Sequence, residues 1–388
     1  MKKQVIIADI ASRLEDESIP YEVTGAAALY IQGIDHIDVG EIRIDVQWDV
    51  MDRAYEIFQP YAPGEVKRDK VQAAFSFSYE GETVVIACLF NTTVRTQPYR
   101  VSVQIEEREV WCRSLYSYLY YPEHAEFGSA IHTFLQERQR AITAQNETAW
   151  NTSNYAALLN RHGEPAVVAE KIQQNPEWRL HPFLKYMKDV QGKRVIHLMG
   201  SHGIKAVALA LLGADVAVVD FSQENAMFAG ELAKHAGVEL SYVVSDVLSA
   251  DLEAEAADFV LMELGVLHYY LDLQPLAQII HRLLKPGGRF VLHEFHPVSV
   301  KMITSSGKKH KVDGNYFDPS LRQRQVAFSK HVAAEETEAV LQRKWTMGEL
   351  VTAFAGSGLI IRILEEEPNH KLHDIGLPKT FTLVAERI

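Results

Sequence analysis

The second half of the chain alternates between short apolar runs and stretches in which apolar residues recur at helical spacing. The apolar runs are typical of buried strands, because they are short and rich in β-branched residues. Regular alternation of strands and helices predicts a parallel sheet that helices cover on both faces. In such a sheet a ligand binds at the carboxyl ends of the strands. The predicted strands are residues 195–199, 215–220, 240–246, 259–264 and 289–295.

This alternation stops after His296 and Pro297. A polar insertion follows over 297–344, and a helix from Thr346 and two further apolar strands complete the pattern. An insertion at the carboxyl edge of a sheet is typical of a lid or a substrate-binding segment. We expect the insertion to have that role.

A helix and a polar joint separate this half from the first. Residues 129–146 predict a helix whose second half is polar and solvent-exposed, and the joint follows at 146–154. The length of 388 residues also favours two domains. We therefore predict an N-terminal domain over 1–140 and a C-terminal domain over 141–388.

Charge narrows the choice of partner. The chain is 47% hydrophobic and 23% charged, as soluble globular proteins are. It carries 39 Lys and Arg against 51 Asp and Glu, and the resulting net charge of -12 repels phosphate backbones. Nucleic acid is therefore a poor candidate partner. Three lysines within 305–314 are more typical of a solvated loop than of a contact with an anion, and they are only a weak indication of an anionic small molecule.

The cysteines and the apolar segments indicate in which cellular compartment the protein is expected. The only cysteines, Cys88 and Cys112, have no paired spacing, so we expect neither a disulfide framework nor a cysteine zinc site. Asp9 and Arg13 break the N-terminal apolar run, unlike a signal peptide. No uncharged segment is long enough to cross a bilayer. We therefore expect a cytoplasmic protein without a membrane partner.

Four features at the predicted strand ends carry candidate chemistry. The turn Gly200–Gly203 joins a strand to a helix, where backbone N–H groups and the helix N-terminus favour a negatively charged ligand. Asp220 ends the second strand, where a carboxylate can accept hydrogen bonds from both ribose hydroxyls of an adenosine. Asp246 ends the third, and a Pro-Gly-Gly turn at 286–288 leads into the fifth. Each feature alone is equally a plain turn or a helix cap, but the ordered set is more specific.

Taken in this order, the features resemble class I S-adenosylmethionine-dependent methyltransferases. The resemblance runs from Arg194 to Glu386 and includes the glycine loop, the acidic strand ends, the "LLKPGG" turn and the two final strands. It implies an α/β fold with a seven-stranded, Rossmann-like sheet whose last strand is antiparallel. It also implies S-adenosylmethionine as the cofactor.

The resemblance further implies which residues hold the cofactor, with Trp150 and Tyr155 closing over it from an upstream helix. Packing between the domains is the alternative role of those two aromatic residues. The family carries an acid and then Gly-x-Gly-x-Gly, and here His197 stands at the acid while only Gly203 keeps its glycine position. The implied positions in the sheet and its loops are His197, Met199, Gly200, Ser201, Gly203, Asp220, Phe221, Ser222, Asp246, Val247 and Glu263.

Methyl transfer is an in-line displacement, so positioning and exclusion of water supply much of the catalysis. A general base is needed only where the acceptor must lose a proton. The candidates at the ends of the fourth and fifth strands are His268, His296 and Glu263. We expect no metal, because alternate residues of a strand point to opposite faces, which leaves at most two convergent ligands among residues 293–296.

The fourth strand lacks the Asn-Pro-Pro-Tyr-like run with which amino-methylating nucleic-acid enzymes hold a flipped base. We therefore expect a small-molecule oxygen or nitrogen acceptor. A regulatory protein that binds S-adenosylmethionine without turnover stays open, because the glycine loop is altered. An NAD-dependent oxidoreductase is a remote alternative, since it requires a Gly-x-Gly-x-x-Gly loop that this chain lacks.

The N-terminal half resembles the opening of a minimal nucleotidyltransferase-like domain, over 19–33 and 41–58. Such enzymes hold two metal ions with an Asp-x-Asp pair and a third carboxylate. Here the pair reads Arg43-Ile44-Asp45, and the strand expected to carry the third acid, at 81–90, is apolar at its centre. We therefore expect a smaller α+β domain without catalysis, which binds a ligand, gates the other site or forms a homodimer.

Overall fold

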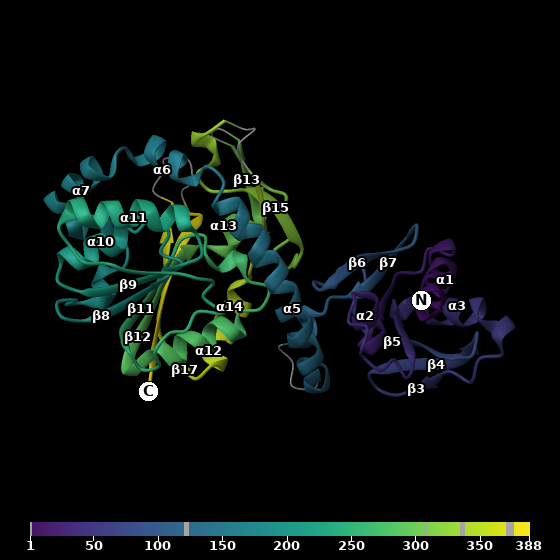
Figure 1. Cartoon of the computed structure of the whole chain (residues 1–388). Coiled ribbons are helices and arrows are strands. Elements are labelled where there is room, and N and C mark those ends of the chain that lie inside the picture. Colours follow the sequence, from purple (N-terminus) through teal and green to yellow (C-terminus); the bar gives the residue numbers. More distant parts are fainter. Residues whose placement is uncertain (1, 120–123, 307–308, 334–337, 370–375) are drawn as a thin grey trace. The chain divides into compact units, whose positions relative to one another are not determined.

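The computed structural model describes residues 2–119, 124–306, 309–333, 338–369 and 376–388. It divides the chain into two compact units, Met1–Leu135 with Phe317–Pro319, and Gln136–Tyr316 with Ser320–Ile388. Helix α5 (Ala125–Trp150) contains both this division and the predicted one after residue 140 (Figure 1). The predicted joint at 146–154 therefore begins later than expected, because the helix continues through its polar residues to Trp150.

The first unit holds a seven-stranded mixed sheet in the order β3-β4-β5-β2-β1-β7-β6. Strand β1 runs antiparallel to β2 and parallel to β7. The sheet packs against α1, whose buried face includes Ile7, Ile10 and Leu14. The described elements are α1 (Lys2–Asp16), β1 (Tyr21–Thr24), α2 (Gly25–Ile31), β2 (Ile42–Val46), α3 (Met51–Ile57), β3 (Lys67–Arg68), β4 (Gln72–Tyr79), β5 (Glu82–Leu89), β6 (Arg100–Ile105), β7 (Arg108–Arg113) and α4 (Tyr116–Leu119).

The second unit holds the predicted α/β sheet, and its seven strands are confirmed in the order β10-β9-β8-β11-β12-β18-β17. The first five run parallel, and β18 is antiparallel to both β12 and β17. The strands are β8 (Arg194–Leu198), β9 (Asp215–Asp220), β10 (Ser241–Val244), β11 (Ala257–Glu263), β12 (Leu284–Phe295), β17 (Leu359–Pro368) and β18 (Pro378–Arg387).

Helices cover both faces of this sheet (Figure 1). One core joins β8 through Val195 to α10 and α11, and the other joins it through Ile196 to α12 and α14. Successive residues of a strand point to opposite faces, so a buried strand requires an apolar residue at nearly every position. The helices are α6 (Asn154–His162), α7 (Pro165–Gln174), α8 (Pro176–Leu180), α9 (Leu184–Met187), α10 (Ile204–Leu211), α11 (Gln223–Ala236), α12 (Gln274–Leu283) and α14 (Met347–Gly356).

Strand β12 begins five residues before the predicted strand, at Leu284. The Pro-Gly-Gly turn lies inside it as an irregularity, because the pairing with β11 shifts between Ala257 and Phe259. A Cβ atom on Gly288 would lie 3.0 Å from the carbonyl oxygen of Ala257. Glycine is therefore required where the two backbones approach.

The predicted insertion contains α13 (Pro297–Met302) and two antiparallel hairpins. The first joins β13 (Ile303–Ser306) to β14 (Lys309–Val312), and the second joins β15 (Leu321–Gln325) to β16 (Ala339–Arg343). Of its lysine-bearing loop, Gly307 and Lys308 lie outside the described residues. Within the ranges described above, no helix combines the length and the apolar character needed to span a membrane.

Candidate functional site

The loop after β8 holds left-handed backbone at alternate residues. The φ angles are 52° at Met199, 47° at Ser201 and 73° at Gly203. These are the three positions where the resembled family has glycine. A left-handed residue other than glycine costs about 1–2 kcal/mol, so the surrounding structure holds the loop in this shape. Glycine itself is required at Gly203, because a Cβ atom there would lie 2.7 Å from Ala229 Cβ.

His197 lies buried beneath this loop, and no other described residue hydrogen-bonds to its ring nitrogens. Burial, with a smaller effect from Lys205, lowers the pKa of His197 to about 3. The ring is therefore neutral at physiological pH. It cannot replace the carboxylate that the family carries at this position.

Asp220 joins the glycine loop to the start of α11. Its Oδ2 accepts from the Ser201 N–H at 3.1 Å. Its Oδ1 accepts from the Ser222 N–H at 2.9 Å and from Asn225 Nδ2 at 3.3 Å. Burial raises the pKa of Asp220, and these donors oppose the rise. Two carboxylate oxygens offer about four acceptor positions, so one stays available to a ligand.

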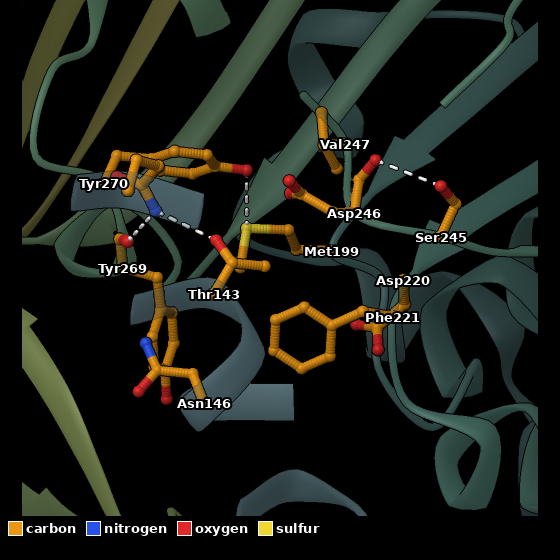
Figure 2. Close-up of a pocket in the computed structure, with 11 residues that line it drawn as sticks. Thr143, Asn146, Met199, Asp220, Phe221, Ser245, Asp246, Val247, Tyr269 and Tyr270 are labelled. Carbon is orange, nitrogen blue, oxygen red and sulfur yellow. Dashed lines mark hydrogen bonds between the residues drawn. The ribbon is translucent and has the colours of Figure 1, made fainter. Parts of the chain in front are cut away.

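A narrow cavity lies at the carboxyl ends of β8, β9 and β10 (Figure 2). Its volume is about 20 Å³, room for about one water molecule. In Figure 2 the Phe221 ring and the Met199 thioether lie in the middle of the group, and Tyr270 Oη donates to Met199 Sδ at 3.1 Å. Entry of an adenosine therefore requires these side chains to move. The lining residues are Gln139, Thr143, Asn146, Met199, Asp220, Phe221, Ser245, Asp246, Val247, Tyr269 and Tyr270.

Five of the predicted cofactor residues line this cavity, namely Met199, Asp220, Phe221, Asp246 and Val247. The other predicted cofactor residues do not line the cavity, and they have other contacts. Ser222 caps α11 by accepting from the Asn225 N–H, Tyr155 hydrogen-bonds to Glu231 on α11, and Trp150 Nε1 donates to Tyr269 Oη at the cavity edge. The remaining ones, His197, Gly200, Ser201, Gly203 and Glu263, lie in or below the loop and at the end of β11.

One wall of the cavity was missed by the sequence analysis. Gln139, Thr143 and Asn146 lie on α5 at positions i, i+4 and i+7, which is one face of a helix. Gln139 Nε2 donates to the Tyr269 carbonyl at 2.9 Å, and its Oε1 accepts from the Leu271 N–H at 2.7 Å. The polar second half of this helix therefore faces the site, where the sequence favoured solvent. The spacing of these polar residues along one helix face could have predicted that this face lines a site.

A second, larger cavity of about 330 Å³ lies between the ends of β11 and β12, the second hairpin of the insertion and α14. The short helix Leu267–Tyr269 contributes to both cavities, through Tyr269 to the first and through Leu267 and His268 to the second. The lining residues of the second are Leu267, His268, Glu294, Phe295, Pro297, Val300, Arg324, Gln325, Gln342, Lys344, Trp345 and Leu350.

Of the predicted bases, only His268 lines this cavity. Burial, with a smaller effect from Lys344, lowers the pKa of His268 to about 3. Glu294 also lines the cavity, but its carboxylate accepts from the N–H groups of Gly265 at 2.5 Å and Phe295 at 2.7 Å. Glu294 therefore holds the loop after β11 in place.

His296 and Glu263 have other contacts. His296 Nδ1 accepts from the Val298 N–H at 3.2 Å and so caps α13, and its Nε2 lies 2.6 Å from Glu366 Oε1. With both ring nitrogens engaged, His296 is not available as a general base. Glu263 forms an ion pair with Lys205. Among the residues that the structure describes, no three His, Cys, Asp or Glu side chains gather as a metal site.

The first unit places the acid of its Arg43-Ile44-Asp45 frame in a buried cluster. Asp45 lies opposite Glu22 across the β1–β2 pair. Arg43 Nε donates to Asp45 at 3.1 Å, and Arg113 forms an ion pair with Glu22. Burial raises the pKa of both carboxyl groups, and the arginines oppose the rise. The two acids are therefore neutralised by side chains of the same unit.

Comparison with known proteins gives a family match that includes part of the first cavity. Residues 199–292 match a protein family described as Methyltransferase domain. Over 114 residues the chain is 29% identical to a demethylmenaquinone methyltransferase from Clavibacter sepedonicus, a match that covers 29% of this chain and 46% of that relative. The chain thus spans about half the length of the curated relative that it matches.

Two solved structures are similar to about half of this chain at low identity. A candidate S-adenosylmethionine-dependent methyltransferase from Listeria monocytogenes is 21% identical, with a TM-score of 0.45, over 55% of this chain and 98% of that chain. An S-adenosylmethionine-dependent methyltransferase from Mesorhizobium loti has the same identity and coverage and a TM-score of 0.44. The family match, which includes the cavity residues Met199, Asp220 and Asp246, supports a methyltransferase domain in the second unit.

Proposed function

We propose that the second unit transfers a methyl group from S-adenosylmethionine to an oxygen or nitrogen atom of a small molecule. The observation that carries the proposal is the pair of cavities that share the short helix Leu267–Tyr269. The first cavity lies at Asp220 and Asp246, and the second lies beyond it at the carboxyl ends of β11 and β12. When bound, the cofactor supplies an electrophilic methyl group on a sulfonium.

In this proposal the residues of the first cavity orient the adenosine. Asp220 accepts from one ribose hydroxyl through its remaining acceptor position, and Asp246 and Val247 contact the adenine. The left-handed backbone of the loop 199–203 directs the N–H groups of Met199, Ser201 and Gly203 to partners within the protein, and so holds the loop in its shape beside the ligand. Phe221 and Tyr269 exclude water from the reacting centre.

The second cavity would hold the acceptor. Phe295, Trp345 and Leu350 give it apolar walls, while Arg324 and Lys344 bring positive charge. A histidine with a pKa of about 3 is a weak base, so His268 accepts a hydrogen bond more readily than it removes a proton. The arrangement therefore favours an apolar acceptor that carries an anionic group and whose reacting atom is already a nucleophile.

The test is turnover of the full chain with S-adenosylmethionine and a panel of small aromatic acids, phenols and amines. We expect S-adenosylhomocysteine to form with at least one anionic acceptor, faster than in its absence. The same experiment separates a second candidate, a regulatory protein that binds the cofactor without turnover. That candidate is favoured by the narrow first cavity and by the three protein donors on Asp220. Binding without any turnover across the panel would contradict the enzyme and support the regulator.

For the first unit we propose a nucleotidyltransferase-like domain that has lost catalysis. The support is the buried pairing of Asp45 with Arg43 and of Glu22 with Arg113, which engages both of these facing carboxylates with arginines instead of metal ions. We expect no calorimetric signal for magnesium with nucleoside triphosphates at millimolar concentration, and no release of pyrophosphate. Magnesium-dependent release of pyrophosphate that Asp45→Asn removes would contradict the loss of catalysis.

A further inference from the structure

Two opposite charges meet beside the glycine loop, one at the start of α10 and one at the end of β11. Lys205 Nζ lies 3.3 Å from Glu263 Oε2. The same Nζ donates to the Arg179 carbonyl at 2.5 Å and lies 5.2 Å from the centre of the Phe183 ring. The two side chains are 22% and 16% exposed, so the pair is largely withdrawn from water but still reachable.

This pair lies next to His197, which stands where the resembled family has an acid. His197 pairs with Leu261 on β11, and Glu263 follows Leu261 by two residues on the same face of the sheet. Glu263 Oε1 lies 4.0 Å from His197 Nε2, which is beyond hydrogen-bond distance. The neighbouring strand thus supplies a carboxylate next to the histidine that has replaced one.

The energetics of the pair favour a ligand. A buried ion pair recovers in attraction roughly what its two charges lose in hydration, so burial of charge gives little stability by itself. Here the buried His197 ring also has no hydrogen-bond partner among the described residues. Because that ring is neutral, one of its nitrogens can only accept a hydrogen bond. One cation, one anion and one acceptor therefore lie together at the carboxyl end of β8 and β11.

We propose that Lys205 and Glu263 recognise the amino acid end of S-adenosylmethionine. Glu263, with His197 beside it, accepts from the α-ammonium group, and Lys205 binds the α-carboxylate. The zwitterion matches the pair in charge, so binding exchanges one ion pair for two and leaves no charge without a partner. The inference rests on the proposed cofactor use and deepens it, because it moves recognition of the methionine from β8 to β11 and α10.

The test compares two ligands by calorimetry on the full chain. S-adenosylhomocysteine carries the amino acid, and 5′-methylthioadenosine carries the adenosine and a thioether without it. We expect Lys205→Met and Glu263→Gln to weaken S-adenosylhomocysteine binding about 10-fold to 100-fold. Binding of 5′-methylthioadenosine should change by less than about twofold, because neither residue contacts the adenosine. Lys205→Arg, which keeps the charge, should restore most of the loss.

One further variant, which combines both substitutions, separates loss of recognition from loss of folding. Lys205→Met combined with Glu263→Gln removes both charges together, so no single buried charge is left to unfold the protein. We expect this variant to lose the preference for S-adenosylhomocysteine over 5′-methylthioadenosine. Retention of the wild-type preference would overturn the inference while leaving the cofactor assignment in place. Failure of the wild type to bind either ligand would overturn both.

Discussion

Asp220→Ala should abolish cofactor binding. The variant removes the acceptor proposed for the ribose and also leaves the Ser201 N–H, the Ser222 N–H and Asn225 Nδ2 without their shared partner. We expect affinity for S-adenosylhomocysteine to fall by at least about 100-fold, because a charged hydrogen bond and the loop geometry are lost together. The buried donors should lower the free energy of unfolding by about 2–4 kcal/mol. Calorimetry and thermal unfolding measure the two effects separately.

Asp215→Ala is the matched control, since Asp215 begins the strand that Asp220 ends. Asp215 forms an ion pair with Arg194 at 2.5 Å, but its side chain is 67% exposed. Such pairs contribute about 0–1 kcal/mol, so binding and stability should stay close to those of the wild type. If Asp220→Ala lowered stability and still bound S-adenosylhomocysteine normally, Asp220 would be only a link between the loop and α11.

Sequence patterns predicted the second sheet because burial on both faces demands uninterrupted apolar runs, and those runs are local in sequence. They located Asp220 and Asp246 for the same reason, since a ligand site lies where such runs end. The start of β12 was placed too late. Proline and glycine at 286–288 indicate a turn, and only the partner strand shows that they form an irregularity within a strand.

The details of the site depended on contacts between distant residues. Nothing about methionine or serine predicts left-handed backbone, so the conformation of Met199 and Ser201 became visible only in the folded loop. Gln139 lies more than a hundred residues from the Tyr269 carbonyl that it contacts, and its polarity indicated solvent. His296 belongs to a common class, a histidine that caps a helix, which spacing alone does not separate from a base.

The second prediction concerns the wall of the proposed acceptor cavity. Arg343 and Glu349 form an ion pair at 2.5 Å, and their side chains are 1% and 5% exposed. Glu349 also completes a capping box with Thr346 at the start of α14. Between them lie Lys344 and Trp345, which line the cavity, and Trp345 Nε1 donates to the Leu267 carbonyl at 2.9 Å. The ion pair thus joins the end of the second hairpin to α14, and Trp345 between them contacts the short helix shared by both cavities.

Glu349→Ala should lower the free energy of unfolding by about 3–5 kcal/mol, because it removes one partner of a buried pair and breaks the capping box. Asp215→Ala again provides the comparison, since it breaks an ion pair of the same length at the surface of the same unit. Affinity for S-adenosylhomocysteine should stay within about twofold, because no residue of this wall lines the first cavity. Equal stability of the two variants would contradict the role given to burial.

The pH dependence of Glu349→Ala gives an independent check. Burial alone would raise the pKa of Glu349, but Arg343 and the hydrogen bonds from Thr346 outweigh it, so the pKa is lowered. A carboxyl group whose pKa is lower in the folded state stabilises the protein above its unfolded pKa of about 4.3. That contribution is lost as the pH falls through the lowered folded value. The difference in unfolding free energy between wild type and Glu349→Ala should therefore be full at pH 7 and shrink toward pH 3, and an undiminished difference at pH 3 would mean that packing, not charge, holds the wall.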